Sequence, residues 1–233
     1  MTTPPKWGVG YEMVKFPGGV ELNTTVCVLE FTIPNNIKAP ILFYYRLTNF
    51  YQNHRRYVKS LDTDQLKGKA KTASQIRSGD CDPLNTAPNG KPYYPCGLIA
   101  NSKFNDSYED LTFTNEGERG TPFKMTTKGI AWDTEKDLYG KTDYKPEDVM
   151  PPPNWADQYP NRQYTNETGL PDLHNDESFQ VWMRTAGLPT FSKLAMRNDN
   201  DEMKAGTYRL KVLDSLCPVT IIRSPSNCVQ GFL

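Results

Sequence analysis

The chain has 233 residues, in which 27 lysine and arginine residues are balanced by 27 aspartate and glutamate residues. This length suits one large domain or at most two small ones. A net charge of zero argues against a general nucleic-acid binder, which carries a basic excess. Aromatic residues make up 12% of the chain, and its 19 prolines and 16 glycines are typical of a loop-rich β or α+β domain.

The first predicted elements are two strands. Residues 1–24 are rich in proline and glycine, and we expect them to be irregular. Residues 25–33 alternate apolar and polar side chains, which predicts a half-buried strand, and residues 40–47 predict a second one. Residues 49–60 follow directly and predict a short helix that begins near Asn49.

That helical stretch reads NFYQNHRRYVKS and concentrates cationic and aromatic side chains. Helical spacing places Phe50, His54 and Tyr57 on one face, which we expect to point toward the core. Arg55 and Arg56 then lie at the rim. We expect at least one of them to meet a carboxylate or backbone carbonyls, because a half-buried guanidinium is costly to leave unpaired. The stretch is predicted to be framework, or a surface that faces a partner, and not a catalytic site.

The middle of the chain is predicted to consist largely of loops. Residues 68–97 are expected to form a loop, and a strand is expected near residues 110–114. Residues 120–175 contain many turn residues, which predicts a long excursion over the surface with few elements of its own. The sequence has no internal repeat and no interdomain linker, so residues 1–233 are interpreted as a single domain.

The last predicted elements are helical and then extended. A helix is expected over residues 177–183, with Asn175 or Asp176 as its N-cap. A second helical piece is expected over residues 190–196, beyond Pro189. Residues 206–213 predict a strand.

The chain has five cysteines, with no C-x-x-C motif and no histidine at zinc-ligand spacing, so no metal site is predicted. Cys81 and Cys96 bracket a turn-rich loop that a disulfide would close naturally, with a stabilisation of about 3 kcal/mol. The alternative is two buried free thiols. Cys217 and Cys228 are also expected to lie close enough to pair, since the residues between them carry a turn signal.

Three glycosylation sequons begin at Asn23, Asn105 and Asn166, in polar or turn-like surroundings. Together with a disulfide they favour an oxidising lumenal or extracellular compartment. No apolar run approaches 18 residues, so neither a spanning helix nor a signal peptide is predicted.

Signatures of catalysis are missing from the sequence. The GKT at residues 140–142 lacks the glycine that a phosphate-binding loop needs five residues earlier, where Glu135 stands. Neither His54 nor His174 has a serine or cysteine nucleophile partner by motif. We therefore expect no enzymatic activity and no cofactor.

Several motifs together resemble a known family. They are NFYQNHRRYVKS followed by DTDQLKG, then YYPCGLIANSKFND, KGIAW, VWMRTAGLPTFSKL and AGTYRLKV. In this order they are similar to the Cdc-fifty/Lem-three family, the accessory (β) subunits of type-IV P-type ATPases, which are phospholipid flippases. The resemblance covers roughly residues 25–213.

The resemblance implies an antiparallel β-sandwich with short helices and long surface loops, as one exoplasmic domain. It matches Cys81 and Cys96 to a family disulfide and Asn105 to a glycosylated position. Cys27 matches a cysteine whose partner lies upstream, where this chain has none. Residues 214–233 depart from the family pattern.

The resemblance also implies a function: a non-catalytic subunit that forms a heterodimer with the ATPase and supports its folding, its exit from the endoplasmic reticulum and its transport cycle. Phospholipid would be met only through the complex. The location implied is the lumenal or extracellular face of endoplasmic reticulum, Golgi, endosome or plasma membrane, and this stretch by itself is expected to be soluble. The alternative is a secreted glycan- or lipid-binding module in which Trp132, Trp155 and Tyr159 stack on sugars. A hydrolase that depends on His54 or His174 is the third interpretation.

Overall fold

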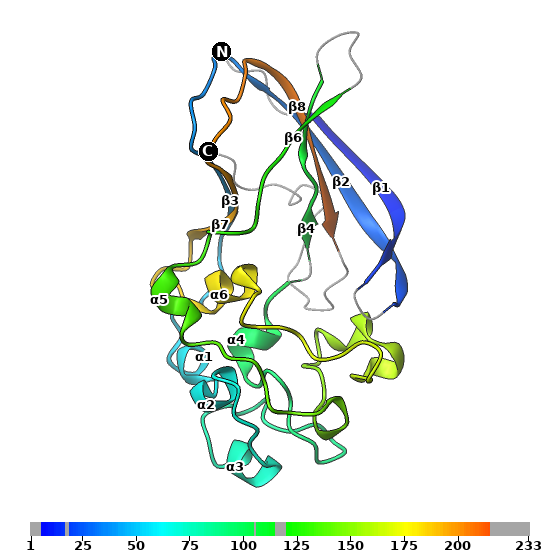
Figure 1. The fold of residues 1–233 in the computed structure, drawn as a ribbon, viewed down its shortest axis with the longest axis vertical. Coiled ribbons are helices and arrows are strands. Elements are labelled where there is room, and N and C mark those ends of the chain that lie inside the picture. The colour runs from blue at the N-terminus through cyan, green and yellow to red at the C-terminus, as the bar shows by residue number, and fades with distance from the viewer. Residues whose placement is uncertain (1–5, 17–18, 105, 115–119, 215–233) are drawn as a thin grey trace.

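A computed structural model describes residues 6–16, 19–104, 106–114 and 120–214 (Figure 1). The strands of the larger sheet fill the upper part of the view, and helices α1 to α4 lie together at the lower end. No helix in these ranges is long and apolar enough to cross a bilayer.

The larger sheet has six antiparallel strands in the order β1-β2-β8-β5-β6, with β4 also paired to β8. Their bounds are Lys6–Lys15 for β1, Glu21–Ile33 for β2, Ser107–Tyr108 for β4, Leu111–Phe113 for β5, Thr121–Phe123 for β6 and Gly206–Asp214 for β8. The strands expected over residues 25–33, 110–114 and 206–213 are confirmed.

The expectation that residues 1–24 are irregular is wrong. β1 and the start of β2 occupy most of it, and β1 pairs with β2 over its whole length, from Lys6 opposite Glu30 to Lys15 opposite Glu21. The sequence KWGVGYEMVK places larger apolar residues at alternate positions, separated by glycine or glutamate, and this two-residue period is that of a β-strand. The expectation of irregular structure rested on the proline and glycine content and overlooked this period.

The smaller sheet pairs β3 (Ile41–Leu47) with β7 (Phe191–Asn198), antiparallel, with an irregularity between Phe43 and Tyr44. β3 confirms the strand expected over residues 40–47. The helical piece expected over residues 190–196 is wrong, because pairing with β3 overrides the helical propensity of its leucine, alanine and methionine.

The two sheets pack face to face around one hydrophobic cluster. Its members come from β2, β5, β8 and the turn before β8 on one side and from β3 and β7 on the other: Leu29, Ile41, Phe43, Leu111, Ala195, Met196, Met203, Tyr208 and Leu210. This arrangement agrees with the expected antiparallel sandwich, in which alternate residues of both sheets fill the space between them.

The described helices lie in two connections, β3 to β4 and β6 to β7. They are α1 (Arg55–Lys59), α2 (Thr63–Leu66), α3 (Ala73–Arg77), α4 (Leu98–Asn101), α5 (Asp133–Lys136) and α6 (Glu177–Met183), with 3-10 turns η1 (Pro146–Asp148), η2 (Ala156–Gln158) and η3 (Pro160–Arg162). Both connections share a second core around Tyr94, Phe179 and Trp182. α6 confirms the predicted helix, and Asp176 is its N-cap, accepting from the Phe179 amide at 2.9 Å.

Candidate interaction site at the first helices and the disulfide loop

His54 does not point toward the core. It is the N-cap residue of α1, its backbone is extended (φ −64°, ψ 130°), and its side chain is exposed. The helix begins at Arg55 rather than near Asn49, because the preceding residues form turns: Asn49 has φ 57°, and the His54 amide donates to the Tyr51 carbonyl. The helical spacing that was expected to place His54 inward therefore does not apply before Arg55.

Gln52 takes the inward position that we expected of His54. Its side chain is fully buried, its Oε1 accepts from the Ala186 amide at 2.9 Å, and its Nε2 donates to the Tyr57 hydroxyl at 3.4 Å. Tyr57 is half-buried, and its hydroxyl lies 2.7 Å from the Ser102 Oγ. Burial raises the pKa of Tyr57, so this hydroxyl stays protonated. Sequence reasoning missed Gln52 because its partner is remote along the chain.

Arg55 and Arg56 are both exposed. Arg56 Nη2 lies 3.4 Å from Asp82 Oδ2, which meets the expectation that one arginine finds a carboxylate. More than half of each of these two side chains is exposed, so the ion pair contributes little to stability. Within the described part of the chain Arg55 has no ion pair. Arg55, Arg56 and the exposed Lys59 form what we call the basic surface.

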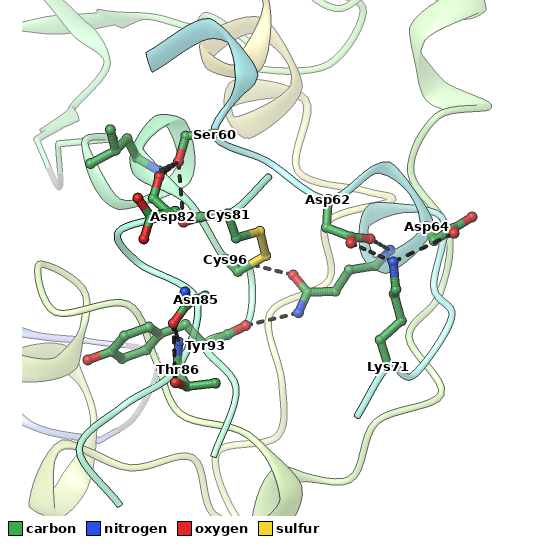
Figure 2. The surroundings of a disulfide bond; sticks show 12 residues. Ser60, Asp62, Asp64, Lys71, Cys81, Asp82, Asn85, Thr86, Tyr93 and Cys96 are labelled. Atoms are coloured by element: carbon green, nitrogen blue, oxygen red, sulfur yellow. Dashed lines mark hydrogen bonds and ion pairs between the residues drawn. A yellow bond between two sulfur atoms is a disulfide. The ribbon is translucent and has the colours of Figure 1, made fainter. Parts of the chain in front are cut away.

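Cys81 and Cys96 form a disulfide, with their Cα atoms 5.7 Å apart (Figure 2). Both are buried and pack with Ile76. The buried Ser60 at the end of α1 ties the disulfide loop down: its Oγ accepts from the Leu98 amide at 2.9 Å and donates to the backbone carbonyl of Asp82 at 3.0 Å. A disulfide of this kind forms in an oxidising compartment.

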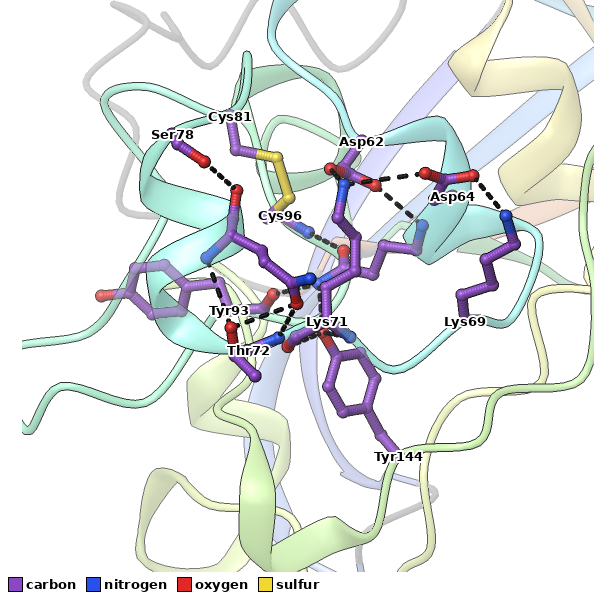
Figure 3. A network of polar contacts seen from close by, with 12 residues as sticks. Asp62, Asp64, Lys69, Lys71, Thr72, Ser78, Cys81, Tyr93, Cys96 and Tyr144 are labelled. Atoms are coloured by element: carbon purple, nitrogen blue, oxygen red, sulfur yellow. Dashed lines mark hydrogen bonds and ion pairs between the residues drawn. A yellow bond between two sulfur atoms is a disulfide. The ribbon is translucent and has the colours of Figure 1, made fainter.

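Asp62, the N-cap of α2, and Gln65 within α2 extend this framework. Figure 3 shows Asp62 with its partner Lys71. Gln65 is fully buried; it accepts from the Cys96 amide and donates to the Tyr93 carbonyl, both at 2.9 Å. Asp62 caps α2 through the Gln65 amide at 2.8 Å and pairs with Lys71 at 2.6 Å. The hydrogen bond to Asp62 raises the pKa of Lys71. These contacts join DTDQLKG to YYPCG.

The GKT sequence has a structural explanation. The Gly140 amide donates to the Leu66 carbonyl at 2.9 Å, and a Cβ on Gly140 would lie 2.2 Å from the Lys67 carbonyl oxygen. On the other side, Gly68 has φ +102°, and its Cβ would lie 2.2 Å from the Lys141 carbonyl oxygen. Two backbones touch here, and only glycine allows that approach.

Glu177 and Lys193 are further framework residues that the sequence did not reveal. Glu177 Oε2 accepts from the amides of Ile130 and Ala131, at 2.9 and 3.1 Å. Lys193 Nζ donates to the carbonyls of Val181, Trp182 and Arg184 at 2.5 to 2.9 Å, which caps the end of α6. Burial lowers the pKa of Lys193 to about 7.

The remaining predicted residues are dispersed. Asn23 is exposed on β2, and Asn166 is exposed in a turn. His174 is exposed, and its Nδ1 lies 2.6 Å from the Tyr139 carbonyl oxygen. Cys27 is buried in β2 and disulfide-bonded. Asn105, Cys217 and Cys228 lie outside the described residues.

The aromatic residues of the alternative glycan-binding hypothesis do not all lie together: Trp155 and Tyr159 line one cavity, and Trp132 is not part of its lining. Trp155 is 6% exposed and packs on Phe179, whereas Trp132 is 63% exposed with the Arg184 guanidinium 4.2 Å from its ring centre. In the described ranges, no three histidine, cysteine or acidic side chains lie close enough together to hold a metal ion.

The sequence profile of the LEM3 (ligand-effect modulator 3) family / CDC50 family matches residues 15–218 of the chain. The chain belongs to this family. Several motifs that resemble the family meet in space. Ser60 of the first motif and Gln65 of the second contact the segment around Cys96, and KGIAW contacts Glu177 of the helix that carries VWM.

Members of the LEM3/CDC50 family from several organisms are similar to the chain. The phospholipid-transporting ATPase accessory subunit CRF1 of Saccharomyces cerevisiae is 51% identical over 189 residues, which is 81% of this chain and 46% of that protein. The accessory subunit CDC50 of Chaetomium thermophilum is 44% identical over 206 residues, 86% and 50% of the two chains. Cell cycle control protein 50A of Mus musculus is 37% identical over 204 residues, 82% and 55%. The chain spans about half the length of the curated relatives it matches.

Proposed function

We propose that this chain is the exoplasmic part of a non-catalytic accessory subunit of a phospholipid-transporting ATPase. The observation that carries the proposal is its membership of the LEM3/CDC50 family, in which similar proteins bear that name. The catalytic subunit of a type-IV P-type ATPase is its partner in a heterodimer, and phospholipid is met only through the complex.

The framework around the disulfide supports a scaffolding role. Buried polar side chains such as Ser60, Gln65 and Gln52 tie segments that are far apart in sequence, and satisfied networks of this kind rigidify a fold. A rigid subunit that binds only the folded ATPase stabilises it by mass action. This is how the subunit supports folding of the ATPase, its exit from the endoplasmic reticulum and its transport cycle.

The location proposed is the lumenal or extracellular face of secretory-pathway membranes. The buried Cys81–Cys96 disulfide fits an oxidising compartment. The exposure of Asn23 and Asn166 fits their use as acceptors for N-linked glycans.

The basic surface is the proposed contact with the ATPase. Arg55, Arg56 and Lys59 are exposed together on one short helix, and Arg55 has no ion pair within the described part of the chain. Arg56 pairs with the exposed Asp82, and exposed cations of this kind steer and orient an acidic partner surface more than they stabilise the fold.

Affinity purification of the membrane-anchored full-length protein from detergent tests the proposal. We expect a P-type ATPase among the co-purifying proteins, identified by mass spectrometry. Purification with a soluble glycan or lipid and without an ATPase would instead favour the glycan- or lipid-binding module.

A matched pair of variants tests the contact itself. The double variant Arg55→Ala/Arg56→Ala should fold normally and recover less ATPase. Its control, Lys38→Ala/Arg46→Ala, removes two exposed cations next to and in β3 and should recover as much as the unmodified protein. Normal recovery with both variants would exclude the basic surface as the contact while leaving the partnership intact.

A further inference from the structure

A cavity of about 680 Å³ lies where the sandwich meets the helical part. It is lined by the end of β1, by β3 and β7, and by residues from 103–104, 106–108, 155–159 and 168–178. Its size falls within the range of sites that hold small molecules.

Two glycosylation sequons reach this cavity. Thr168, the third residue of Asn166-Glu167-Thr168, lines it, and so does Ser107, the third residue of the sequon at 105–107. Asn166 lies in a tight turn in which the Gly169 amide donates to the Thr165 carbonyl at 2.8 Å, and its side chain is exposed. A sugar attached to Asn166 therefore starts two residues from the cavity wall.

The wall has the chemistry that recognises a sugar. Tyr45 and Phe104 meet edge to face at 5.1 Å, and with Tyr159 they offer aromatic surface. The hydroxyls of Tyr45 and Tyr159 have no hydrogen-bond partner among the described residues. Burial raises the pKa of Tyr159 to about 12 and that of Tyr45 further, so both hydroxyls remain neutral donors.

The lining carries charges of both signs, Lys15 and Lys103 against Asp106, Asp172 and Asp176. Lys103 pairs with Asp176 at 2.8 Å, and Asp172 accepts from the Asn175 side chain at 2.7 Å, so no cluster of cations is left to bind an anionic headgroup. An acyl chain would leave the two tyrosine hydroxyls unpaired. An N-acetylhexosamine has apolar C–H faces for the rings and hydroxyl and amide groups for the tyrosines.

We propose that this cavity seats the proximal N-acetylglucosamine of an N-linked glycan on Asn166. The inference rests on the lumenal location in the proposed function. The glycan then serves as part of the fold: its first sugar covers aromatic surface between the sandwich and the helical part, and the outer sugars extend into solvent.

Site-specific deglycosylation of the folded protein tests this. The chain is expressed through a secretory pathway, treated with peptide N-glycosidase under native conditions, and followed by glycopeptide mass spectrometry. Release at Asn166 should be at least about tenfold slower than at Asn23, a factor that corresponds to 1.4 kcal/mol of protection. Asn23 is the matched control, because it is exposed on β2 and lies outside the cavity lining.

The variant Tyr45→Phe/Tyr159→Phe removes the two hydroxyls and keeps the rings. It should raise the release rate at Asn166 toward that at Asn23. Equal release rates in the unmodified protein, protection that the variant leaves unchanged, or an unoccupied Asn166 beside an occupied Asn23 would each overturn the inference alone. Absence of glycan at every sequon would overturn the lumenal location as well.

Discussion

Glu177→Ala is the substitution whose effect the structure defines best. Glu177 is 7% exposed at the start of α6, where its Oε2 accepts from the amides of Ile130 and Ala131. Its Oε1 lies 3.5 Å from Lys136 Nζ. One side chain thus holds the KGIAW segment against the helix that carries VWMR.

The cost follows from the two amides that the substitution leaves behind. Ile130 and Ala131 are 3% and 7% exposed, so water reaches their N–H groups only through the space the side chain vacates. A buried donor without an acceptor costs about 1–3 kcal/mol, which gives about 2–4 kcal/mol for the pair after partial hydration. Glu177→Gln keeps one oxygen that can accept from both amides, so it should cost about half as much.

The assay is urea unfolding at neutral pH, with the free energy obtained by linear extrapolation for all variants. Lys136→Met is the control: it removes the partly exposed ion pairs of Lys136 with Asp133 and Glu177 and should leave the unfolding midpoint nearly unchanged. An unfolding free energy for Glu177→Ala within about 0.5 kcal/mol of the unmodified protein, the usual range of surface substitutions, would refute the reasoning.

The same residue gives a pH dependence of known sign. Burial raises the pKa of Glu177, but the Ala131 and Ile130 amides and the Lys136 ammonium lower it more, so the folded pKa lies below the usual 4.5. The stabilisation is therefore complete above pH 4.5 and is lost as the pH falls through the folded value. Glu177→Gln should remove this part of the acid sensitivity.

Three further substitutions have expected outcomes. Burial lowers the pKa of Lys193 from 10.5 to about 7, so between these two pH values the unfolded chain binds more protons than the folded chain. The free energy of unfolding should therefore rise with pH in this interval. Lys193→Met should reduce this rise, measured as the urea midpoint at several pH values. Cys81→Ser/Cys96→Ser opens a crosslink between residues 15 apart and should cost about 3 kcal/mol by urea unfolding. Gly97→Ala should reduce the yield of folded secreted protein, since its Cβ would lie 2.0 Å from the Ser60 carbonyl oxygen.

Sequence patterns predicted elements correctly where the period and the local signals agreed. Residues 25–33 alternate as a strand and lie in β2, and Asp176 caps α6 as the sequence indicated. Sequence patterns failed where pairing with a strand far away in the sequence decides the conformation. Residues 190–196 read as helix in isolation, yet β3 supplies hydrogen-bond partners about 150 residues away in sequence and makes them a strand.

In the candidate site, too, some contacts can be predicted from local sequence and others cannot. The Cys81–Cys96 pairing follows from a turn-rich loop between two cysteines, which is local information. Glu177 is different: a glutamate in the first turn of a helix is ordinarily solvated, and nothing in its neighbourhood indicates that residues 130 and 131 need its oxygen.

In the stretch NFYQNHRRYVKS, the charged side chains do not indicate which residues attach it to the rest of the fold. Its first residues are held by three contacts with the 186–189 segment: the Phe50 amide donates to the Pro189 carbonyl, Gln52 accepts from the Ala186 amide, and Asn53 donates to the Gly187 carbonyl. These contacts fix the chain before the helix starts, so His54 and the arginines are not needed to hold it. Amides and aromatic rings thus anchor the stretch from the inside, and this leaves Arg55, Arg56 and Lys59 exposed on the surface proposed to meet the ATPase.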